Sequence, residues 1–531
     1  MVTLTVPTDP GTNTVPAVRR RRPRLLVGAS VVVAAVLVLP LVFLIWQAGQ
    51  LGWGPLSSLL FRQLTATLLW NTVKLCVAVT AASAVIGTAA AWCTERTDLP
   101  GRRLWVVLVV IPVAIPDFVV SFGWVSIDPS LHGFLGATLV MTLAVYPLVY
   151  LPVAASFRGA DPGQEEVARS LGLGRVATFW RVTLAQARTA LFGGCLLVSL
   201  ALLAEYGAFE ILRYQTFTTE IFTEFQDGFN PAAACGLSLV LVLLGLVLLT
   251  ADGFGRSSGR TSRSGPQAVR VRPPHRLGRA TVPVLVGFLL LSLLALGVPI
   301  GALIYWLVQG GRTTLPAAAS LSSAAAHSIG YSAAAAALTT MAAVPVALLS
   351  VRHPGRSTMA LERSTFLVLA LPGIVIALAL VFFSERYIPR LYQHGPLLIV
   401  AYAILFFPLA LVAVRASVAQ APIGLEEVAR ALGCKPWTVL WRVTFPLVAP
   451  GLAAAFCLVF LSAVTELTST LILIPTGAQT LATQFWTYTT GQSFGAAAPY
   501  AGLMVVIAVI PSYLLGRWFN RLPAKATPTP L

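Results

Sequence analysis

The sequence predicts an all-α polytopic membrane protein, with twelve transmembrane helices arranged as two parallel six-helix repeats. Three observations lead to this fold class: an apolar composition, twelve apolar runs of spanning length, and one segment that occurs twice. Of the 531 residues, 57% are hydrophobic and only 10% are charged, whereas about a quarter of the residues of a soluble protein are charged. Most of the chain must therefore lie in lipid.

Each of the twelve apolar runs is long enough to cross a bilayer as a helix. The first has 22 residues, more than the ~7–15 of a secretory signal. At about 1.5 Å per residue it spans a hydrocarbon core of about 30 Å, so we expect it to stay in the protein. The runs are 25–46, 69–93, 104–126, 133–157, 189–207, 231–250, 281–308, 329–351, 364–383, 396–414, 448–464 and 497–515.

The positive charges predict which helix ends face the cytosol. With the N-terminus inside, thirty Lys and Arg residues fall in cytosolic segments and five in outer loops, while Lys74 lies within a run. Cytoplasmic loops of membrane proteins are enriched in positive charge. We therefore expect a multi-pass membrane protein with both termini in the cytosol. The net charge of +17 then reflects lipid topology, and no nucleic-acid partner is expected.

The apolar runs also define the predicted domains. A cytosolic tail (1–24) precedes the first transmembrane domain (25–252), and a linker (253–280) leads to the second (281–516), which ends in a cytosolic tail (517–531). The linker is rich in Gly, Ser and Pro and holds seven Arg and no acidic residue. This composition favours a flexible connection held inside by its charge over a lipid- or nucleic-acid-binding segment.

One predicted cytosolic segment occurs twice. The sequence EEVARSLG at 165–172 returns as EEVARALG at 426–433, 261 residues later, and WRVT at 180–183 returns at 441–444 with the same offset. Six predicted spans separate the copies, and an even number places both on one side of the membrane. The halves are then parallel repeats about an axis along the membrane normal. Two equivalent loops on one face could bind two copies of one soluble partner.

Each copy is predicted to fold as a helix–turn–helix. The acidic pair that opens it suits the positive end of a helix, and Gly172 and Gly433 stand where a left-handed residue ends a helix. Pro436 fits the first turn of the next helix. Ala168 and Ala429 leave room for another chain to approach closely.

The spacing of these residues resembles the EAA loop of ABC importer permeases. The loop pattern is Glu-x-Ala-x3-Gly-x9-(Ile/Val)-x-Leu-Pro. The copies cover about 158–188 and 419–449, with Ala185 in the first where Pro446 stands in the second. The resemblance implies a place in the bacterial inner membrane and the type I ABC importer fold, in which this loop docks on the ATPase subunit. It implies an ATPase-coupling role for Glu165, Glu166, Ala168, Gly172, Glu426, Glu427, Ala429 and Gly433.

The chain is expected to be a non-catalytic subunit without a cofactor. A P-loop requires Gly-Lys-(Ser/Thr), and Lys74, Lys435 and Lys525, the only lysines, have other neighbours. A membrane-bound enzyme would need a nucleophile–base pair or a metal cluster, and the sequence shows neither. The resemblance implies a separate ATPase subunit in two copies and an extracytoplasmic substrate-binding protein as partners.

The segments after the fifth run of each half indicate the cargo. The sequences AEYGAF at 204–209 and TELTST at 465–470, followed by QTFTTEIF at 215–222 and QTLATQFW at 479–486, resemble the fused permeases of ferric-iron importers. The resemblance implies ferric iron, although thiamine, phosphonate, polyamine and sulfate permeases share the architecture. A 6+6 secondary transporter is the alternative from another class, but it would give the repeated cytosolic loop no partner.

Glu205 and its repeat equivalent Glu466 are predicted to lie inside the membrane. A helix from Arg188 to Glu205 covers roughly 25 Å, which places this carboxylate in the outer half of the bilayer. Intramembrane acids are costly and by default functional, and oxygen ligands suit a hard cation. The alternative is a carboxylate that binds the end of a broken helix. We expect Glu205 and Glu466, with Tyr206 and Asp117, to line the translocation pathway.

Overall fold

The computed structural model shows an almost entirely helical chain. Apart from loops, the described residues contain only helices and one isolated bridge between Thr97 and His275. The predicted tails and the middle of the predicted linker lie largely outside the described residues. The described ranges are 23–50, 52–226, 230–257, 275–310 and 315–521.

The first half of the chain begins with a long helix and ends with another. Between them, two long helices alternate with shorter, broken ones. The elements are α1 (Arg24–Gln50), α2 (Trp53–Leu60), α3 (Gln63–Arg96), α4 (Arg102–Val110), η1 (Ile111–Ala114), α5 (Asp117–Ile127), α6 (Gly133–Val145), α7 (Pro147–Gly159), α8 (Pro162–Ser170), α9 (Arg175–Thr178), η2 (Phe179–Thr183), α10 (Leu184–Ala204), α11 (Gly207–Ile211), α12 (Phe217–Gln226) and α13 (Pro231–Ser257).

The second half repeats this order. Its elements are η3 (Gly278–Ala280), α14 (Thr281–Ser292), η4 (Leu293–Gly297), α15 (Val298–Gln309), α17 (Ala318–Arg352), α18 (Arg356–Phe366), η5 (Leu367–Ala370), α19 (Gly373–Tyr387), η6 (Pro389–Leu391), α20 (Gly395–Leu405), α21 (Phe407–Gln420), α22 (Ile423–Ala431), α23 (Pro436–Val439), η7 (Leu440–Thr444), α24 (Phe445–Val464), α25 (Thr468–Leu473), α26 (Leu481–Thr490) and α27 (Phe494–Arg521).

The described helices are those of a polytopic membrane protein. Eight are long and apolar enough to cross a membrane, and three bent pairs raise the number to eleven if each pair is one span. A further apolar helix, Phe494–Val509, is shorter. The all-helical membrane fold is thus confirmed, while the count of twelve spans stays a prediction.

The third predicted span of each half is broken at a proline. The axes of the helices before and after Pro116 differ by 95°, and those on either side of Pro372 by 103°. Proline has no N–H group and disfavours the helical conformation of the residue before it. Ile115 and Leu371 accordingly have ψ angles of 125° and 104°. The runs 104–126 and 364–383 therefore each form two helices, so that α5 and α19 start inside the bundle.

The two halves are interlocked through their first spans. Helix α1 packs on α17, α18 and α19 of the second half, and α14 and α15 pack on α4 and α5 of the first. Phe43 meets Phe383 edge-on at 5.7 Å between ring centroids, and Trp105 faces Phe288 at 5.5 Å. Both hydrophobic cores accordingly contain residues from both halves, so the repeats form one bundle.

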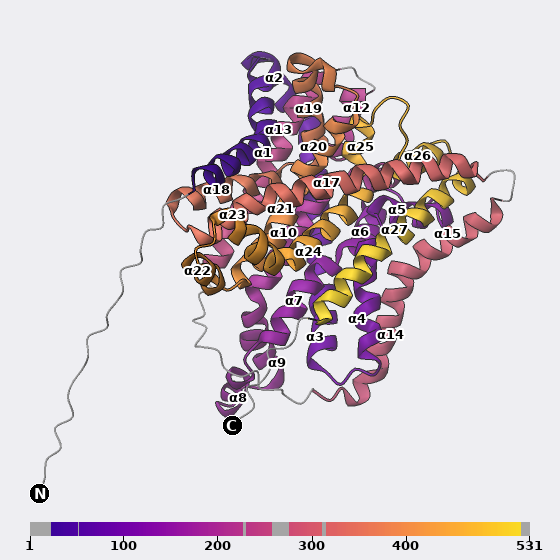
Figure 1. Cartoon of the computed structure of the whole chain (residues 1–531). Helices are drawn as coiled ribbons and strands as arrows, with labels where there is room; N and C mark the ends of the chain where they lie inside the picture. The colour runs from indigo at the N-terminus through magenta and orange to yellow at the C-terminus, as the bar shows by residue number, and fades with distance from the viewer. Residues whose placement is uncertain (1–22, 51, 227–229, 258–274, 311–314, 522–531) are drawn as a thin grey trace, which may run out of the picture.

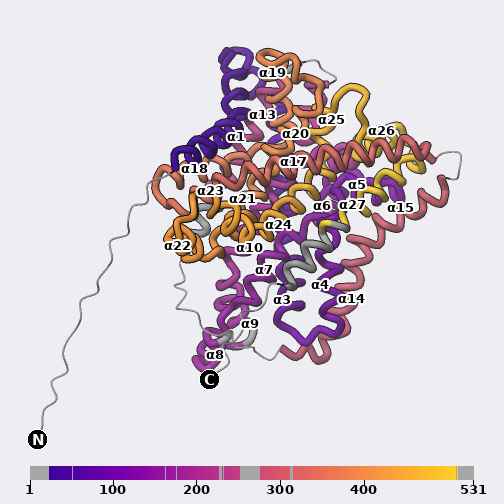
Figure 2. Tube along the Cα trace, viewed as in Figure 1, coloured from indigo at the N-terminus to yellow at the C-terminus, as the bar shows by residue number. Residues whose placement is uncertain are grey.

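The repeated loops lie on one side of this bundle. Figure 1 shows α8 at the bottom and α22 at the left, both away from α26 at the upper right. The tube in Figure 2 follows α3 and α17 along the bundle toward these loops. Arg96 and Arg352 are the last residues of these two helices, and both therefore end next to a repeated loop.

Candidate functional site

The two repeated loops fold as predicted. In each, a nine-residue helix (α8 or α22) is followed by a left-handed glycine, Gly172 with φ 87° and Gly433 with φ 81°. The N–H of Leu173 donates to the carbonyl of Ala168 at 3.0 Å, and that of Cys434 donates to Ala429 at 3.1 Å. These bonds close the helix end as in a Schellman motif. We call the segments from α8 to η2 and from α22 to η7 the elbows.

The predicted coupling residues face in two directions. Glu166 and Glu427 are exposed, as are both glycines. Ala168 is buried and Ala429 half-buried. By contrast, only 2% of Glu165 and 4% of Glu426 is exposed. The first glutamate of each elbow therefore faces the permease, and only the second is accessible to another protein.

Each buried glutamate binds the arginine that ends the neighbouring long helix. Glu165 Oε1 lies 3.4 Å from Arg96 of α3 and accepts a hydrogen bond of 2.7 Å from the Thr183 hydroxyl. Glu426 Oε1 lies 2.9 Å from Arg352 of α17. We call these two ion pairs the clamps. Each ties an elbow to a membrane-spanning helix.

The clamp in the second half has additional partners. Arg352 also donates to the carbonyl of Ala421 at 3.1 Å, and Arg430 binds Glu426 Oε2 at 3.2 Å. Sequence reasoning counted Arg96 and Arg352 only as positive charges of cytosolic loops. The signal that could have revealed them is their shared place at the end of the second span of each half.

The outer surface of each elbow is apolar. Large hydrophobic side chains at four matched positions, each pair 261 residues apart, are at least half exposed. Exposed apolar patches of this kind mark interaction sites. We call these sets the elbow patches: Val167, Leu171, Val176 and Trp180 in the first half, and Val428, Leu432, Trp437 and Trp441 in the second.

Glu205 and Glu466 each cap a short helix at the centre of the bundle. Glu205 Oε1 accepts from the N–H of Ala208 at 2.7 Å, and Glu466 Oε1 accepts from the N–H of Ser469 at 3.0 Å. A carboxylate at this end of a helix is favoured by the free N–H groups there. Both side chains remain half-buried, so capping leaves part of each residue accessible.

Asp117 and Tyr206 lie beside these glutamates. A Cβ atom at Gly207 would lie 2.6 Å from Leu467 and 3.0 Å from Phe118, so the segments that carry Glu205, Glu466 and Asp117 meet and bring acids of both halves together. Asp117 opens α5 directly after its proline, where α19 has Gly373 instead. A Cβ atom at Gly373 would lie 2.9 Å from Glu466 Oε1, so the second half has no room for an equivalent acid. Tyr206 is buried.

A helical membrane bundle with two equivalent exposed apolar surfaces and a central group of acids is the arrangement expected of the membrane-spanning subunit of a solute transporter. The comparisons with known proteins agree. The family model of the binding-protein-dependent transport system inner membrane component matches residues 83–254 and 337–527. The chain belongs to this family of ABC importer permeases and contains its domain twice.

Several relatives have named cargoes. The chain is 37% identical over 503 residues to the Fe(3+)-transport system permease protein FbpB 2 of Haemophilus influenzae, a match that covers 94% of this chain and 99% of that protein. It is 22% identical to the ferric transport system permease protein FbpB of Actinobacillus pleuropneumoniae over 80% of this chain and 67% of that one. The sulfate transport system permease protein CysW of Synechocystis sp. is 30% identical over 40% of this chain and 85% of its own length.

Proposed function

We propose that this permease imports ferric iron, which an extracytoplasmic binding protein delivers and a separate ATPase drives inward. The observation that carries the proposal is the near full-length similarity to a ferric permease, which includes both halves. The sulfate relative matches only 40% of the chain. We further propose twelve spans with both termini in the cytosol, because the elbows and most positive charges then lie on the cytosolic side.

Two identical ATPase subunits are the partners that fit the elbows best. The exposed apolar side chains of the two elbow patches stand at matched positions, so two copies of the same ATPase subunit can bind the two elbows through the same surface. Glu166 and Glu427 are accessible beside these patches. The clamps would then transmit a movement of the elbows to α3 and α17, because each buried ion pair joins an elbow glutamate to the arginine that ends one of these helices.

Uptake in a strain that lacks its iron importers tests the cargo. Cells that express the chain with its ATPase and binding protein are expected to accumulate radioactive ferric iron, and unlabelled sulfate, thiamine, phosphonate or polyamine should not compete. Deletion of the permease should remove iron uptake alone. Iron uptake that is unchanged by the deletion would contradict the proposed cargo. Competition by sulfate or thiamine would indicate that the permease carries that solute instead.

The central acids are proposed to line the translocation pathway. Replacing both Glu205 and Glu466 with glutamine keeps a side-chain oxygen that can cap the short helices but removes two negative charges. Iron uptake is expected to fall by at least about tenfold, since each lost charge–ligand contact is worth about 1.5–3 kcal/mol. ATP hydrolysis should remain measurable in the assembled complex. Wild-type uptake by this double variant would assign both residues a purely structural role.

A further inference from the structure

Tyr206 and Leu467, which hold equivalent places in the repeat, directly follow the central acids. Both are buried, with 3% of each residue exposed, whereas Glu205 and Glu466 are half-buried. The next residue in each half is buried as well. The chain that follows each acid therefore covers it on one side, and the accessible part of the carboxylate faces another.

Tyr206 is held between one aromatic residue of each half. Its ring stacks on Phe222 at 4.3 Å between ring centroids and contacts Trp486 at 5.5 Å. Phe222 and Trp486 are equivalent, because the helices that carry them start alike: the N–H groups of Thr216 and Thr480 each donate to the hydroxyl of the threonine three residues later. Equivalent residues that meet at one ring must lie close to the axis that relates the halves, where a pathway between the halves would run.

A glycine lets the second half approach this point closely. A Cβ atom at Gly207 would lie 2.6 Å from Cδ2 of Leu467, 3.0 Å from Cβ of Phe118 and 3.5 Å from the ring of Trp486. Gly207 does not have a positive φ, so the close contacts and not the backbone conformation account for the glycine. The second half has Thr468 at this place. The first half therefore leaves a space that the side chain of Leu467 fills.

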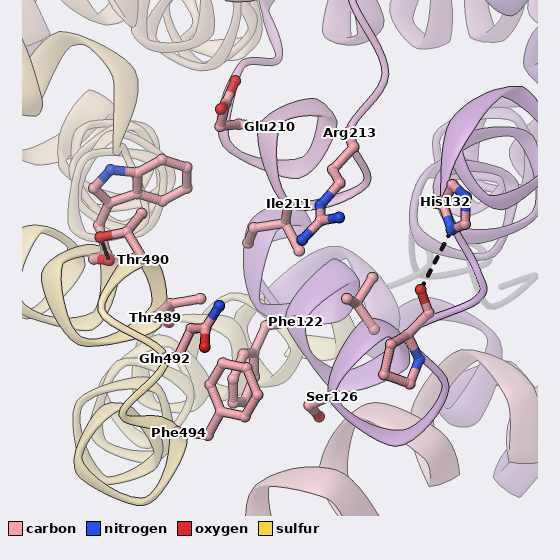
Figure 3. A pocket seen from close by; sticks show the side chains of 13 residues that line it. Phe122, Ser126, His132, Glu210, Ile211, Arg213, Thr489, Thr490, Gln492 and Phe494 are labelled. Atoms are coloured by element: carbon pink, nitrogen blue, oxygen red, sulfur yellow. Dashed lines mark hydrogen bonds between the residues drawn. The ribbon is translucent and has the colours of Figure 1, made fainter.

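A cavity of about 280 Å³ lies beyond these residues, at the end of the bundle away from the elbows. Exposed residues such as Gln492 form its rim, while the buried Trp486 and Phe122 also line it. Figure 3 shows Phe122 beside Phe494 of the other half, which it meets edge-on at 5.4 Å between ring centroids. Trp486 thus lines the cavity and also contacts Tyr206, so its ring stands between the outer surface and the acids.

We propose that five residues form the outer gate of the translocation pathway, which is shut in this structure. They lie between two halves that must part for a solute to pass, and they separate the outer cavity from the acids. Closely packed apolar side chains can gate a pathway by excluding water and ions. The inference rests on the proposed function for the direction of transport. We call the five residues the seal: Tyr206, Gly207, Phe222, Leu467 and Trp486.

One block of three helices connects the seal to the first clamp. A Cβ atom at Gly87 of α3 would lie 2.9 Å from the backbone nitrogen of Tyr150 in α7, and one at Gly194 of α10 would lie 2.8 Å from the Cα of Val149 in α7. Helices α3 and α10 therefore pack against the same turn of α7, too closely to slide past it. Helix α3 ends at the clamp arginine, and α10 ends directly before Glu205, so a movement of the first elbow would reach the seal.

Labelling of a cysteine beside the acids tests the seal without iron, ATPase or binding protein. The full-length chain, with its six native cysteines replaced by alanine, receives Ser469→Cys, because the Ser469 hydroxyl lies 3.1 Å from the carboxylate of Glu466. Right-side-out membrane vesicles are treated with a membrane-impermeant thiol reagent. The thiol at position 469 should stay unlabelled behind the intact seal, whereas Gln492→Cys on the rim of the outer cavity should react rapidly.

Variants of the seal should expose this thiol. Trp486→Ala removes the ring between the cavity and the acids, and Gly207→Val displaces Leu467, so each should raise the labelling rate at position 469 by about tenfold or more. Phe134→Ala is the control, because it removes an aromatic ring that packs on Tyr214 within the first half, and it should leave the thiol unlabelled. Melting temperatures show that each variant is folded. Rapid labelling behind the intact seal, or no increase in either seal variant, would overturn the proposal.

Iron uptake by the assembled transporter connects the seal to transport. Gly207→Val should continue to hydrolyse ATP, but the number of iron ions taken up per ATP should fall by about tenfold, because a gate that does not shut lets cargo return. Uptake per ATP equal to that of the wild type, in a variant whose thiol is labelled, would show that the seal is not the gate. Absence of iron uptake by the wild type would contradict the proposed cargo and leave the labelling result standing.

Discussion

Replacement of both Leu171 and Leu432 by aspartate is expected to detach the ATPase and abolish transport. These side chains are 77% and 79% exposed at matched positions of the elbow patches. Burial of a leucine in an interface contributes about 1.5–3 kcal/mol, and an aspartate in the same place adds an unpaired charge. The combined loss should weaken ATPase binding by about a thousandfold or more.

Co-purification of the ATPase with the permease measures this effect. Each single substitution should leave one intact elbow patch and therefore partial ATPase binding, whereas the double variant should retain no ATPase. Phe61→Asp is the control, because Phe61 is equally exposed, at 84%, but follows α2 on the face away from the elbows. Full retention of the ATPase by the double variant would show that the elbow patches are not its docking surface.

Replacement of Arg352 by leucine is expected to uncouple ATP hydrolysis from uptake. It leaves the buried carboxylate of Glu426 with only Arg430, whose side chain is 46% exposed. Breaking one side of a buried ion pair costs about 3–5 kcal/mol, so the elbow should detach locally from α17. The expected result is a lower melting temperature and fewer iron ions taken up per ATP hydrolysed.

The double variant Arg352→Leu with Glu426→Leu separates stability from coupling. Replacing both charges by apolar groups restores stability in many proteins, so the melting temperature should recover while the ratio of uptake to hydrolysis stays low. Arg415→Leu serves as the control, since Arg415 pairs with Glu362 at an exposed site and such pairs contribute at most about 1 kcal/mol. A normal uptake ratio in Arg352→Leu would exclude a coupling role for the clamp.

Local features of the fold were predictable from the sequence. The left-handed Gly172 and Gly433 follow from residues within one helical turn, and the repeat offset of 261 residues placed both elbows correctly. The prolines of the third spans were visible as well. These prolines break each third span into two helices at about a right angle. The angle depends on how neighbouring helices satisfy the freed carbonyl groups, and the local sequence does not determine that packing.

Long-range contacts explain what sequence reasoning missed. Arg96 meets Glu165 across 69 residues, and Arg352 meets Glu426 across 74, so no local pattern joins them. The exchange of first spans between halves depends on packing of the whole bundle.

Transport by the purified chain in liposomes, with and without the ATPase, tests the central claim most directly. Vesicles that contain the permease are supplied with iron-loaded binding protein outside and ATP inside. Iron should enter only when the ATPase is also present and should stop when a non-hydrolysable nucleotide replaces ATP. Entry at the same rate without the ATPase, driven by an ion gradient, would show that the elbows serve another purpose and that the chain is a secondary transporter.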